Sequence, residues 1–285
     1  MIKFLTTLLL AFLLSLPAAA AAQKKSAYSR VTETKTIRCG YLPYDPFVIK
    51  DPNTGKFSGI TVDYINIISA RHGLKVDWAA EVNVDQIVPA LDNGRIDAFC
   101  IPSSPDTNWA KVADFSSGLG AMPYFIHVPA DSTITMKGLS AATFAIVDGF
   151  ALTDITKEMF PEAKYVSLPQ TTSAAEMYDQ LRYGKVQAHV NEQISAANYM
   201  KNNPGVIRRW SDQPVMVVRM FLVTPKNDPE MGAFMRRTFD AGIPENMTLL
   251  RDLMARYQVP EDALFLGDRC APAETDKGWT ICAME

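Results

Sequence analysis

The stretch Asp85–Ser116, DQIVPALDNGRIDAFCIPSSPDTNWAKVADFS, predicts a helix, a tight stop, a short buried strand and a polar loop. Apolar residues within 87–91 have helical spacing, Gly94 supplies a left-handed helix end, and 96–101 is an apolar run consistent with a parallel strand. Ligands of open α/β sheets bind just beyond the carboxyl ends of such strands. The loop 102–111 is therefore a candidate ligand loop.

A second copy of this pattern follows about ninety residues later in the chain. Residues 180–188, QLRYGKVQA, repeat the Leu, Gly, basic, β-branched and Ala positions of residues 90–98, ALDNGRIDA. Two similar α/β units favour two lobes. The same helix-Gly-basic-strand pattern is common in α/β proteins of all kinds, so the repeat alone is also compatible with a single domain.

Helices and strands alternate along most of the chain, which predicts parallel sheets covered by helices. We expect lobe 1 to comprise residues 36–125 and 216–285 and lobe 2 to comprise residues 126–215. Two crossovers then make a hinged clamshell with polar loops of both lobes facing one cleft. The expected strands are 37–41, 74–79, 96–101, 143–147, 164–168 and 186–190, and the expected helices start near 61, 85, 153, 173, 193, 231 and 247.

The N-terminus is typical of an exported protein. Residues 1–22 combine Lys3, an apolar run and an alanine string, which predict a signal peptide cleaved near Ala22. No Cys lies at the cleavage site, so we expect an exported protein of the periplasm that is not lipid-anchored. Residues 23–35 are polar and predict a flexible leader.

Charge and composition exclude some classes of function. The formal net charge is −3, and it becomes −4 when Lys3 is removed with the signal peptide. The basic residues are scattered, so nucleic acid is not an expected partner. The chain has no Gly-rich phosphate loop and no metal-ligand spacing, so we expect no cofactor or metal.

Four cysteines remain after export, where disulfide bonds can form. Cys39 and Cys100 lie on apolar runs that would be neighbouring strands, and Cys270 and Cys282 lie in a tail that a disulfide could staple. Four cysteines permit three pairings, and the sequence does not choose among them. A zinc site of two Cys and one His is a rival interpretation, disfavoured by the absence of close Cys/His spacing.

Several short motifs occur in the order seen in a known family: 37–41 with Pro46-Phe47, 59–63, 88–91 with 94–97, and Asp114-Phe115-Ser116. From Thr36 to Tyr257 the chain resembles the periplasmic solute-binding proteins of family 3, the polar amino-acid receptors of ABC importers. The resemblance implies a two-lobed periplasmic-binding-protein-like α/β clamshell, each lobe a mostly parallel sheet flanked by helices. It also implies a small polar ligand, a membrane permease as partner and a monomer.

The resemblance implies ligand contacts in lobe 1. Tyr44 matches an aromatic residue that stacks on the ligand, with Phe47 beside it, although both rings can instead belong to the core and for Phe47 we favour the core. Ser103 and Ser104 match the loop that supplies hydroxyl and backbone contacts.

In lobe 2, the resemblance implies that Gly149 to Thr153 form the helix start that holds the ligand carboxylate. Glu192 matches the acidic residue that holds the ligand amine, and charge-assisted hydrogen bonds of this kind are strong when partly dry. Glu192 can instead be a solvent-facing charge at a helix N-terminus. Asn191 is an alternate contact.

One departure from the family concerns the carboxylate-binding Arg, expected five residues before Asp-Phe-Ser. Trp109 occupies this position, or Thr107 if two residues are inserted, and neither replaces a guanidinium. Trp109, Tyr44 and Glu192 would suit an amine or another cation through ring-face attraction, unless Trp109 packs beneath the loop. Arg219 is a candidate for a relocated positive charge.

We therefore expect a non-enzymatic binding protein that captures a small polar, amine-bearing molecule, an amino acid or a related compound, for an ABC importer. An accessory or sensor protein on the same scaffold is the main alternative. A lyase similar to cyclohexadienyl dehydratases is the other, with Glu192 as general acid.

Overall fold

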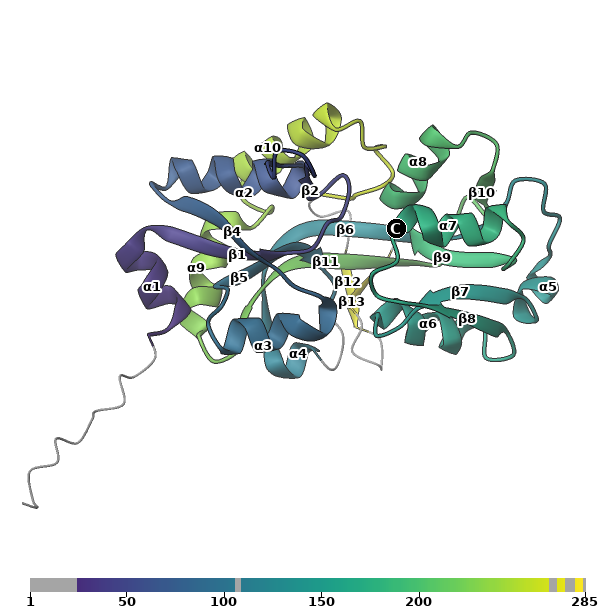
Figure 1. The fold of residues 1–285 in the computed structure, drawn as a ribbon, viewed down its shortest axis with the longest axis horizontal. Coiled ribbons are helices and arrows are strands. Elements are labelled where there is room, and N and C mark those ends of the chain that lie inside the picture. Colours follow the sequence, from purple (N-terminus) through teal and green to yellow (C-terminus); the bar gives the residue numbers. More distant parts are fainter. Residues whose placement is uncertain (1–24, 106–108, 267–270, 275–279, 284–285) are drawn as a thin grey trace, which may run out of the picture.

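A computed structural model describes residues 25–105, 109–266, 271–274 and 280–283. The predicted signal peptide 1–22 lies outside these residues. The main sheet has the strand order β4-β1-β5-β11-β6-β9-β7-β8. Figure 1 shows two lobes with β6 and β11 running between them, so the predicted two-lobed α/β clamshell is confirmed.

Lobe 1 is built on parallel strands: β1 pairs with β4 and β5 in parallel. Of these strands, β5 is almost wholly buried, as expected for a parallel strand with helices on its faces. The elements of this part are β1 (Thr36–Tyr41), β2 (Ile49–Lys50), β3 (Phe57–Ser58), α2 (Ile60–Arg71), β4 (Lys75–Glu81), a 3₁₀ turn (Val84–Gln86), α3 (Ile87–Asp92), β5 (Ala98–Ser103), α4 (Trp109–Val112), α9 (Pro229–Phe239) and α10 (Pro244–Arg256).

Lobe 2 repeats this arrangement, because β7 pairs in parallel with both β8 and β9. The repeat therefore reflects two similar α/β units. The elements of this part are α5 (Met136–Ser140), β7 (Thr143–Val147), α6 (Ala151–Met159), β8 (Lys164–Leu168), α7 (Ala174–Arg182), β9 (Ala188–Glu192), α8 (Gln193–Asn202) and β10 (Ile207–Arg209).

Two long strands connect the lobes. β6 (Ala113–Pro129) and β11 (Met216–Pro225) run antiparallel, from the pair Ala113–Pro225 in lobe 1 to the pair Tyr124–Met216 near lobe 2. β6 continues into lobe 2, where it pairs with β9 and β10. The two predicted crossovers are thus the central strands of one continuous sheet, and the lobe limits at 125 and 216 remain predictions.

The repeated sequence motif has the same physical role in each lobe. Gly94 and Gly184 follow α3 and α7 with φ of 71° and 66°, a left-handed conformation that favours Gly. Three residues later, the side chains of Asp97 and Gln187 accept hydrogen bonds from the backbone N–H of Arg38 (2.9 Å) and Thr143 (2.7 Å). Each motif therefore ends a helix and ties the next strand to the first strand of its lobe.

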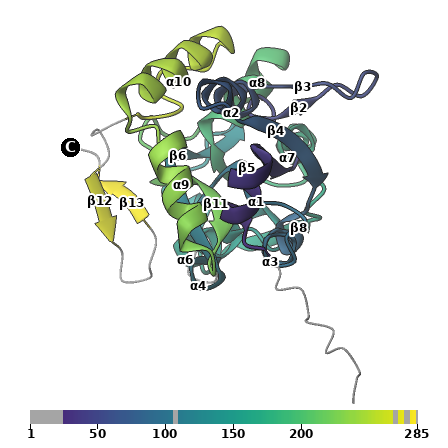
Figure 2. The same ribbon diagram turned by 90° about the vertical axis from the view of Figure 1, so that its left-hand side faces the viewer.

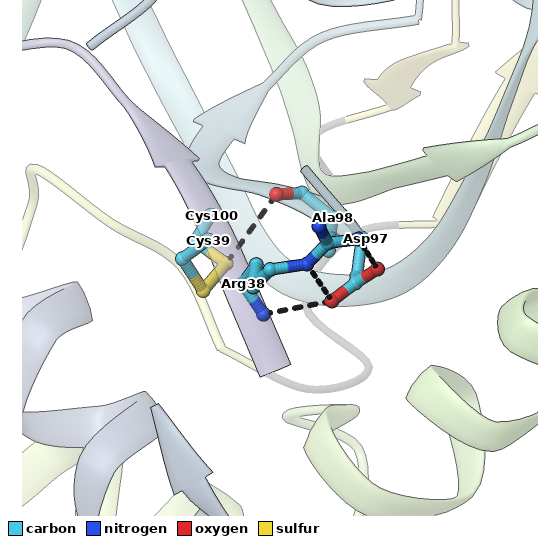
Figure 3. Close-up of a disulfide and its surroundings, with 5 residues drawn as sticks. All are labelled: Arg38, Cys39, Asp97, Ala98 and Cys100. Atoms are coloured by element: carbon cyan, nitrogen blue, oxygen red, sulfur yellow. Dashed lines mark hydrogen bonds and ion pairs between the residues drawn. A yellow bond between two sulfur atoms is a disulfide. The ribbon is translucent and has the colours of Figure 1, made fainter. Parts of the chain in front are cut away.

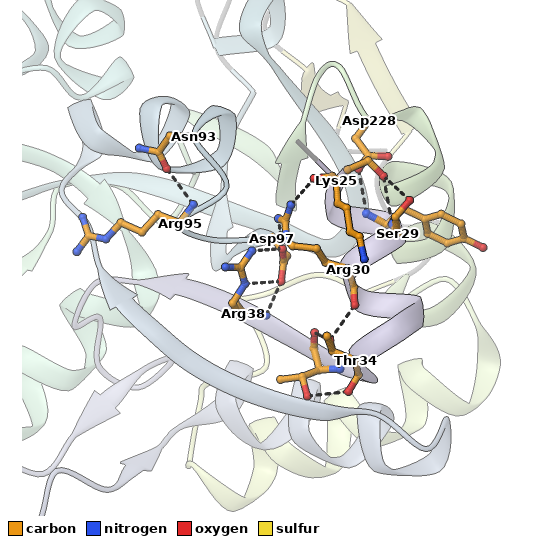
Figure 4. A network of polar contacts seen from close by, with 12 residues as sticks. Lys25, Ser29, Arg30, Thr34, Arg38, Asn93, Arg95, Asp97 and Asp228 are labelled. Carbon is orange, nitrogen blue, oxygen red and sulfur yellow. Dashed lines mark hydrogen bonds and ion pairs between the residues drawn. The ribbon is translucent and has the colours of Figure 1, made fainter. Parts of the chain in front are cut away.

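The prediction of a flexible leader is wrong for residues 27–34, which form helix α1 (Ala27–Thr34). Ser26 caps its first turn, and Ala27 and Val31 are buried. Arg30 reaches the buried carboxylate of Asp97, which also receives both the backbone and the guanidinium of Arg38 (Figure 4). The polar composition suggested flexibility, but this long-range ion pair, the burial of two side chains and the packing of Tyr28 on Phe234 hold the helix on lobe 1.

A disulfide joins Cys39 of β1 to Cys100 of β5, as one of the possible pairings anticipated (Figure 3). It links neighbouring parallel strands that are 61 residues apart in the sequence. Cys270 and the side chain of Cys282 lie outside the described residues, so a tail disulfide remains a prediction.

The chain ends with a hairpin of β12 (Ala271–Glu274) and β13 (Thr280–Ala283), which lies at one side of the molecule (Figure 2). β13 pairs with the crossover strand β11 at Val218. In the part of the chain that the structure describes, no helix has the length and apolar character needed to cross a membrane.

Candidate functional site

A cavity of about 460 Å³ lies between the lobes. Its walls include residues at or just after the carboxyl ends of β1, β4 and β5 of lobe 1 and of β7, β8 and β9 of lobe 2. Ligands of parallel α/β sheets bind at such strand ends, because the loops there present side chains and free backbone groups. Both halves of the sheet thus aim their loops into one shared space.

Glu192 and Tyr44 meet across this cavity. Glu192 is the last residue of β9 and the N-cap of α8, where Oε2 accepts from the backbone N–H of Ser195 at 2.7 Å and Oε1 accepts from the Ser195 hydroxyl. Tyr44, in the loop after β1, donates its hydroxyl to Oε1 of Glu192 at 2.8 Å. The solvent-facing alternative for Glu192 is therefore wrong, since only 2% of the residue is exposed.

Burial controls the electrostatics of this pair. It raises the pKa of the Glu192 carboxyl, while hydrogen bonds from Ser195 and Tyr44 oppose that rise. Burial and the nearby Glu192 carboxylate also raise the pKa of the Tyr44 hydroxyl well above its ordinary value. Tyr44 therefore remains a protonated donor, and the hydrogen bonds that the Glu192 carboxylate accepts, from hydroxyls and backbone N–H groups, all come from neutral donors.

The other residues predicted in lobe 1 occupy different environments. Ser103 and Ser104 line the cavity beyond β5, and the Ser103 hydroxyl donates to the backbone carbonyl of Ile101 at 3.0 Å. Phe47 is not among the lining residues; it is 2% exposed and packs in the core, with its ring 5.1 Å from that of Tyr44. Trp109 begins α4, but its side chain and Thr107 lie outside the described part, so a ligand contact there remains a prediction.

The residues predicted in lobe 2 line the cavity together. Gly149 has a φ of 75° and leads into α6, whose N-terminus has no side-chain cap. Thr153 is mostly buried, and its hydroxyl donates to the carbonyl of Val147 at the end of β7. Asn191 lies on the cavity wall beside Glu192.

Sequence reasoning missed several lining residues that follow the same strand-end rule. Glu81 and Asn83 lie at and after the carboxyl end of β4, and residues 170–173, QTTS, follow β8. Applying the rule to every parallel strand would have found them. Tyr124 was not recognisable, because it belongs to the crossover strand β6.

The charges on the cavity wall are unevenly distributed. Among the described lining residues, Glu81 and Glu192 are acidic and none is Lys or Arg. Arg219, considered as a relocated positive charge, lies on β11 and is not one of the lining residues. The described wall therefore offers two carboxylates and neutral hydrogen-bonding groups.

Comparison with known proteins agrees with this architecture. The sequence profile of the bacterial extracellular solute-binding proteins, family 3, matches residues 37–250. A "Probable histidine-binding protein" of Campylobacter jejuni subsp. jejuni is 26% identical over 220 residues, which cover 74% of this chain and 81% of the relative.

Solved structures share the fold at low sequence identity. The cysteine-binding protein from Campylobacter jejuni has a TM-score of 0.70 at 16% identity and covers 85% of this chain and 100% of its own. An ancestral amino acid-binding protein, described as a precursor of cyclohexadienyl dehydratase, has a TM-score of 0.68 at 22% identity, and the match covers 82% of this chain and 99% of the ancestral protein. The matched profile spans most of the chain, and this protein therefore belongs to the bacterial extracellular solute-binding proteins, family 3.

Proposed function

We propose that this protein is exported to the periplasm, captures a small polar, amine-bearing molecule between its lobes and delivers it to the membrane permease of an ABC importer. The proposed ligand contacts are Tyr44, Ser103, Ser104 and Trp109 of lobe 1 and Gly149, Thr153, Asn191 and Glu192 of lobe 2.

The observation that carries this proposal is the buried carboxylate of Glu192 in the interlobe cavity. Burying a carboxylate away from water is costly unless it is both hydrogen-bonded and paired with a cation. Glu192 has hydrogen bonds from neutral donors only, and an ammonium group of a ligand would supply the missing positive charge.

Closure around the ligand supplies the signal for delivery. Tyr44 of lobe 1 bonds Glu192 of lobe 2, and nearby Asn198 of α8 donates to Asp45 at 3.1 Å. A ligand that contacts both lobes favours the conformation in which these bonds form, because it adds interactions that the open form lacks. A permease that recognises the closed form then receives loaded protein.

We propose binding without catalysis as the activity. The relatives above carry names of binding proteins, although one structural neighbour is described as a precursor of a dehydratase. Incubation with prephenate or arogenate tests the enzyme alternative, because a lyase would release a new product. A sensor or accessory role is the other alternative, and binding without transfer to any permease would favour it.

The test is calorimetric titration with L-histidine, L-arginine, L-cysteine, putrescine and choline. We expect at least one of these probes to bind and Glu192→Gln to weaken its binding by tenfold or more. Glu162→Gln, which changes an exposed carboxylate of lobe 2, is the matched control and should bind as the unmodified protein does. Binding that is unchanged in Glu192→Gln would refute the role of this residue.

A further inference from the structure

We infer that the cavity selects its ligand by positive charge, so that organic amines lacking a carboxylate bind at least as tightly as the corresponding α-amino acids. This inference rests on the proposed function and specifies its ligand class. It arises from the balance of charges around the cavity rather than from any single contact.

The acidic groups lie on opposite sides of the cavity. Glu192 of lobe 2 is buried, whereas Glu81 of lobe 1 is exposed and has Lys50 at 3.8 Å. Lys50 partly offsets Glu81, so Glu192 is the stronger attraction for a cation. No Lys or Arg occurs among the described lining residues.

A ligand carboxylate would have only weak partners on this wall. An Arg binds a carboxylate through two parallel charge-assisted hydrogen bonds, and neutral hydroxyls and amides do not replace that interaction. A carboxylate placed near Glu192 would also add like-charge repulsion in a site partly removed from water. A ligand without a carboxylate avoids both costs.

Helix N-termini are the remaining groups that could favour an anion, and those of α6, α7 and α8 border the cavity. Glu192 itself caps the N-terminus of α8. The N-terminus of α7 is already closed by a capping box, in which Ser173 and the carboxylate of Glu176 bond the first turn. The N-terminus of α6 has no side-chain cap. Its nine residues provide a partial positive charge of about one half, less than the full charge of Glu192 alone.

The rest of the wall suits the body of an organic amine. Tyr44, Tyr124 and Phe150 contribute aromatic rings to the wall, and Phe99, Ile101 and Met220 contribute apolar side chains. Aromatic faces attract cations, and apolar walls favour the methylene chain of an alkyl amine. The buried carboxylate of Glu192, on a wall that also carries rings and aliphatic groups, is a suitable environment for an ammonium on an apolar chain.

The experiment uses the unmodified mature protein and three matched pairs of probes: agmatine with L-arginine, histamine with L-histidine, and cadaverine with L-lysine. The members of each pair differ by one carboxylate. Calorimetric titration at pH 7.5 gives the ratio of dissociation constants within each pair. We expect the amine to bind at least as tightly as the amino acid in every pair that binds.

Variants then assign the effect to the cavity. Glu192→Gln should weaken amine binding by tenfold or more, and Glu81→Gln should weaken it by a smaller factor because Glu81 is exposed and has Lys50 nearby. Amino acids that bind tenfold or more tighter than their amines would overturn this inference while leaving the proposed function intact. Absence of binding by all six probes would overturn this inference, whereas the proposed function fails only if L-cysteine, putrescine and choline also do not bind.

Discussion

Lowering the pH from 8 to 5 should remove about 4 kcal/mol of folding stability through two buried histidines of lobe 2. His127 of β6 and His189 of β9 are direct partners across the sheet and are 0% and 3% exposed. The ring of Tyr178 lies edge-on to both, with centroids 5.5 Å away. Burial of both side chains among these rings disfavours the charged imidazolium form.

The magnitude follows from the pKa values. Burial lowers the pKa of His127 to about 3, assisted by the neighbouring His189 and Arg209, and burial lowers the pKa of His189 to about 4. The ordinary value of about 6.5 applies to the unfolded chain. At pH 5 each histidine is protonated when unfolded and neutral when folded, which costs about 2 kcal/mol per residue.

Whether stability rises or falls with pH depends on which state, folded or unfolded, binds the proton more tightly. Both folded-state pKa values lie below the unfolded value, so stability is complete above about pH 6.5 and is lost as pH falls towards 4 and 3. Glu192 acts in the opposite direction. Burial raises its pKa, so the folded state binds that proton more tightly and loses stability as pH rises through the folded value.

Urea unfolding at pH 8 and pH 5, without ligand, measures the effect. The double variant His127→Gln/His189→Gln retains Glu192 and the other titrating groups, so the difference between its pH dependence and that of the unmodified protein isolates the histidines. Calorimetry in two buffers should also record uptake of about two protons on unfolding at pH 5. Equal pH dependence in both proteins, or no proton uptake, would refute the reasoning.

Three further predictions concern the contacts that hold the lobes. Replacing Cys39 and Cys100 with Ala should lower the free energy of unfolding, measured with urea, by about 4 kcal/mol, because the disulfide joins residues 61 positions apart and so restricts the unfolded chain. A loss below about 1 kcal/mol would contradict this. Asp97→Asn should lower the free energy of unfolding, measured by thermal unfolding, by about 3 kcal/mol, because it leaves two arginines without their buried anionic partner. The control Asp131→Asn, at an exposed position, should leave this free energy almost unchanged. Arg209→Gln removes the 2.7 Å ion pair between Arg209 and Asp262, which joins the lobes and stabilises their closed arrangement by about 1 kcal/mol or less. The radius of gyration of the ligand-free protein in X-ray scattering should therefore increase, and an unchanged value would show that this ion pair does not hold the lobes together.

Sequence periodicity was most informative where local geometry decides the outcome. The strands predicted at 143–147 and 164–168 have those limits in the structure, and Gly94 and Gly184 end their helices as expected. Helix α1 was missed, because its stability depends on Arg30 reaching Asp97, 67 residues away. A segment held by distant partners leaves little signal in its own composition.

The candidate site divides in the same way. The strand-end rule identified the loops around Ser103 and Gly149, and the family resemblance selected Glu192. Neither approach could indicate that Tyr44 bonds Glu192 from the opposite lobe, whereas Phe47, three residues later, packs in the core as the sequence analysis favoured. Neighbouring residues of one loop can face opposite directions, and only the packed chain determines which side chain faces the cavity.

The amino-acid sequence by itself determined the two α/β units, their order and the loops at their strand ends. These features depend on hydrophobic periodicity and glycine positions, which are local properties of a few consecutive residues. Only the tertiary structure decided that β6 and β11 pair as one hinge, that Glu192 is buried and that the described cavity wall has no Lys or Arg. These properties depend on distances between segments far apart in the chain, and burial and charge balance exist only once those segments have come together.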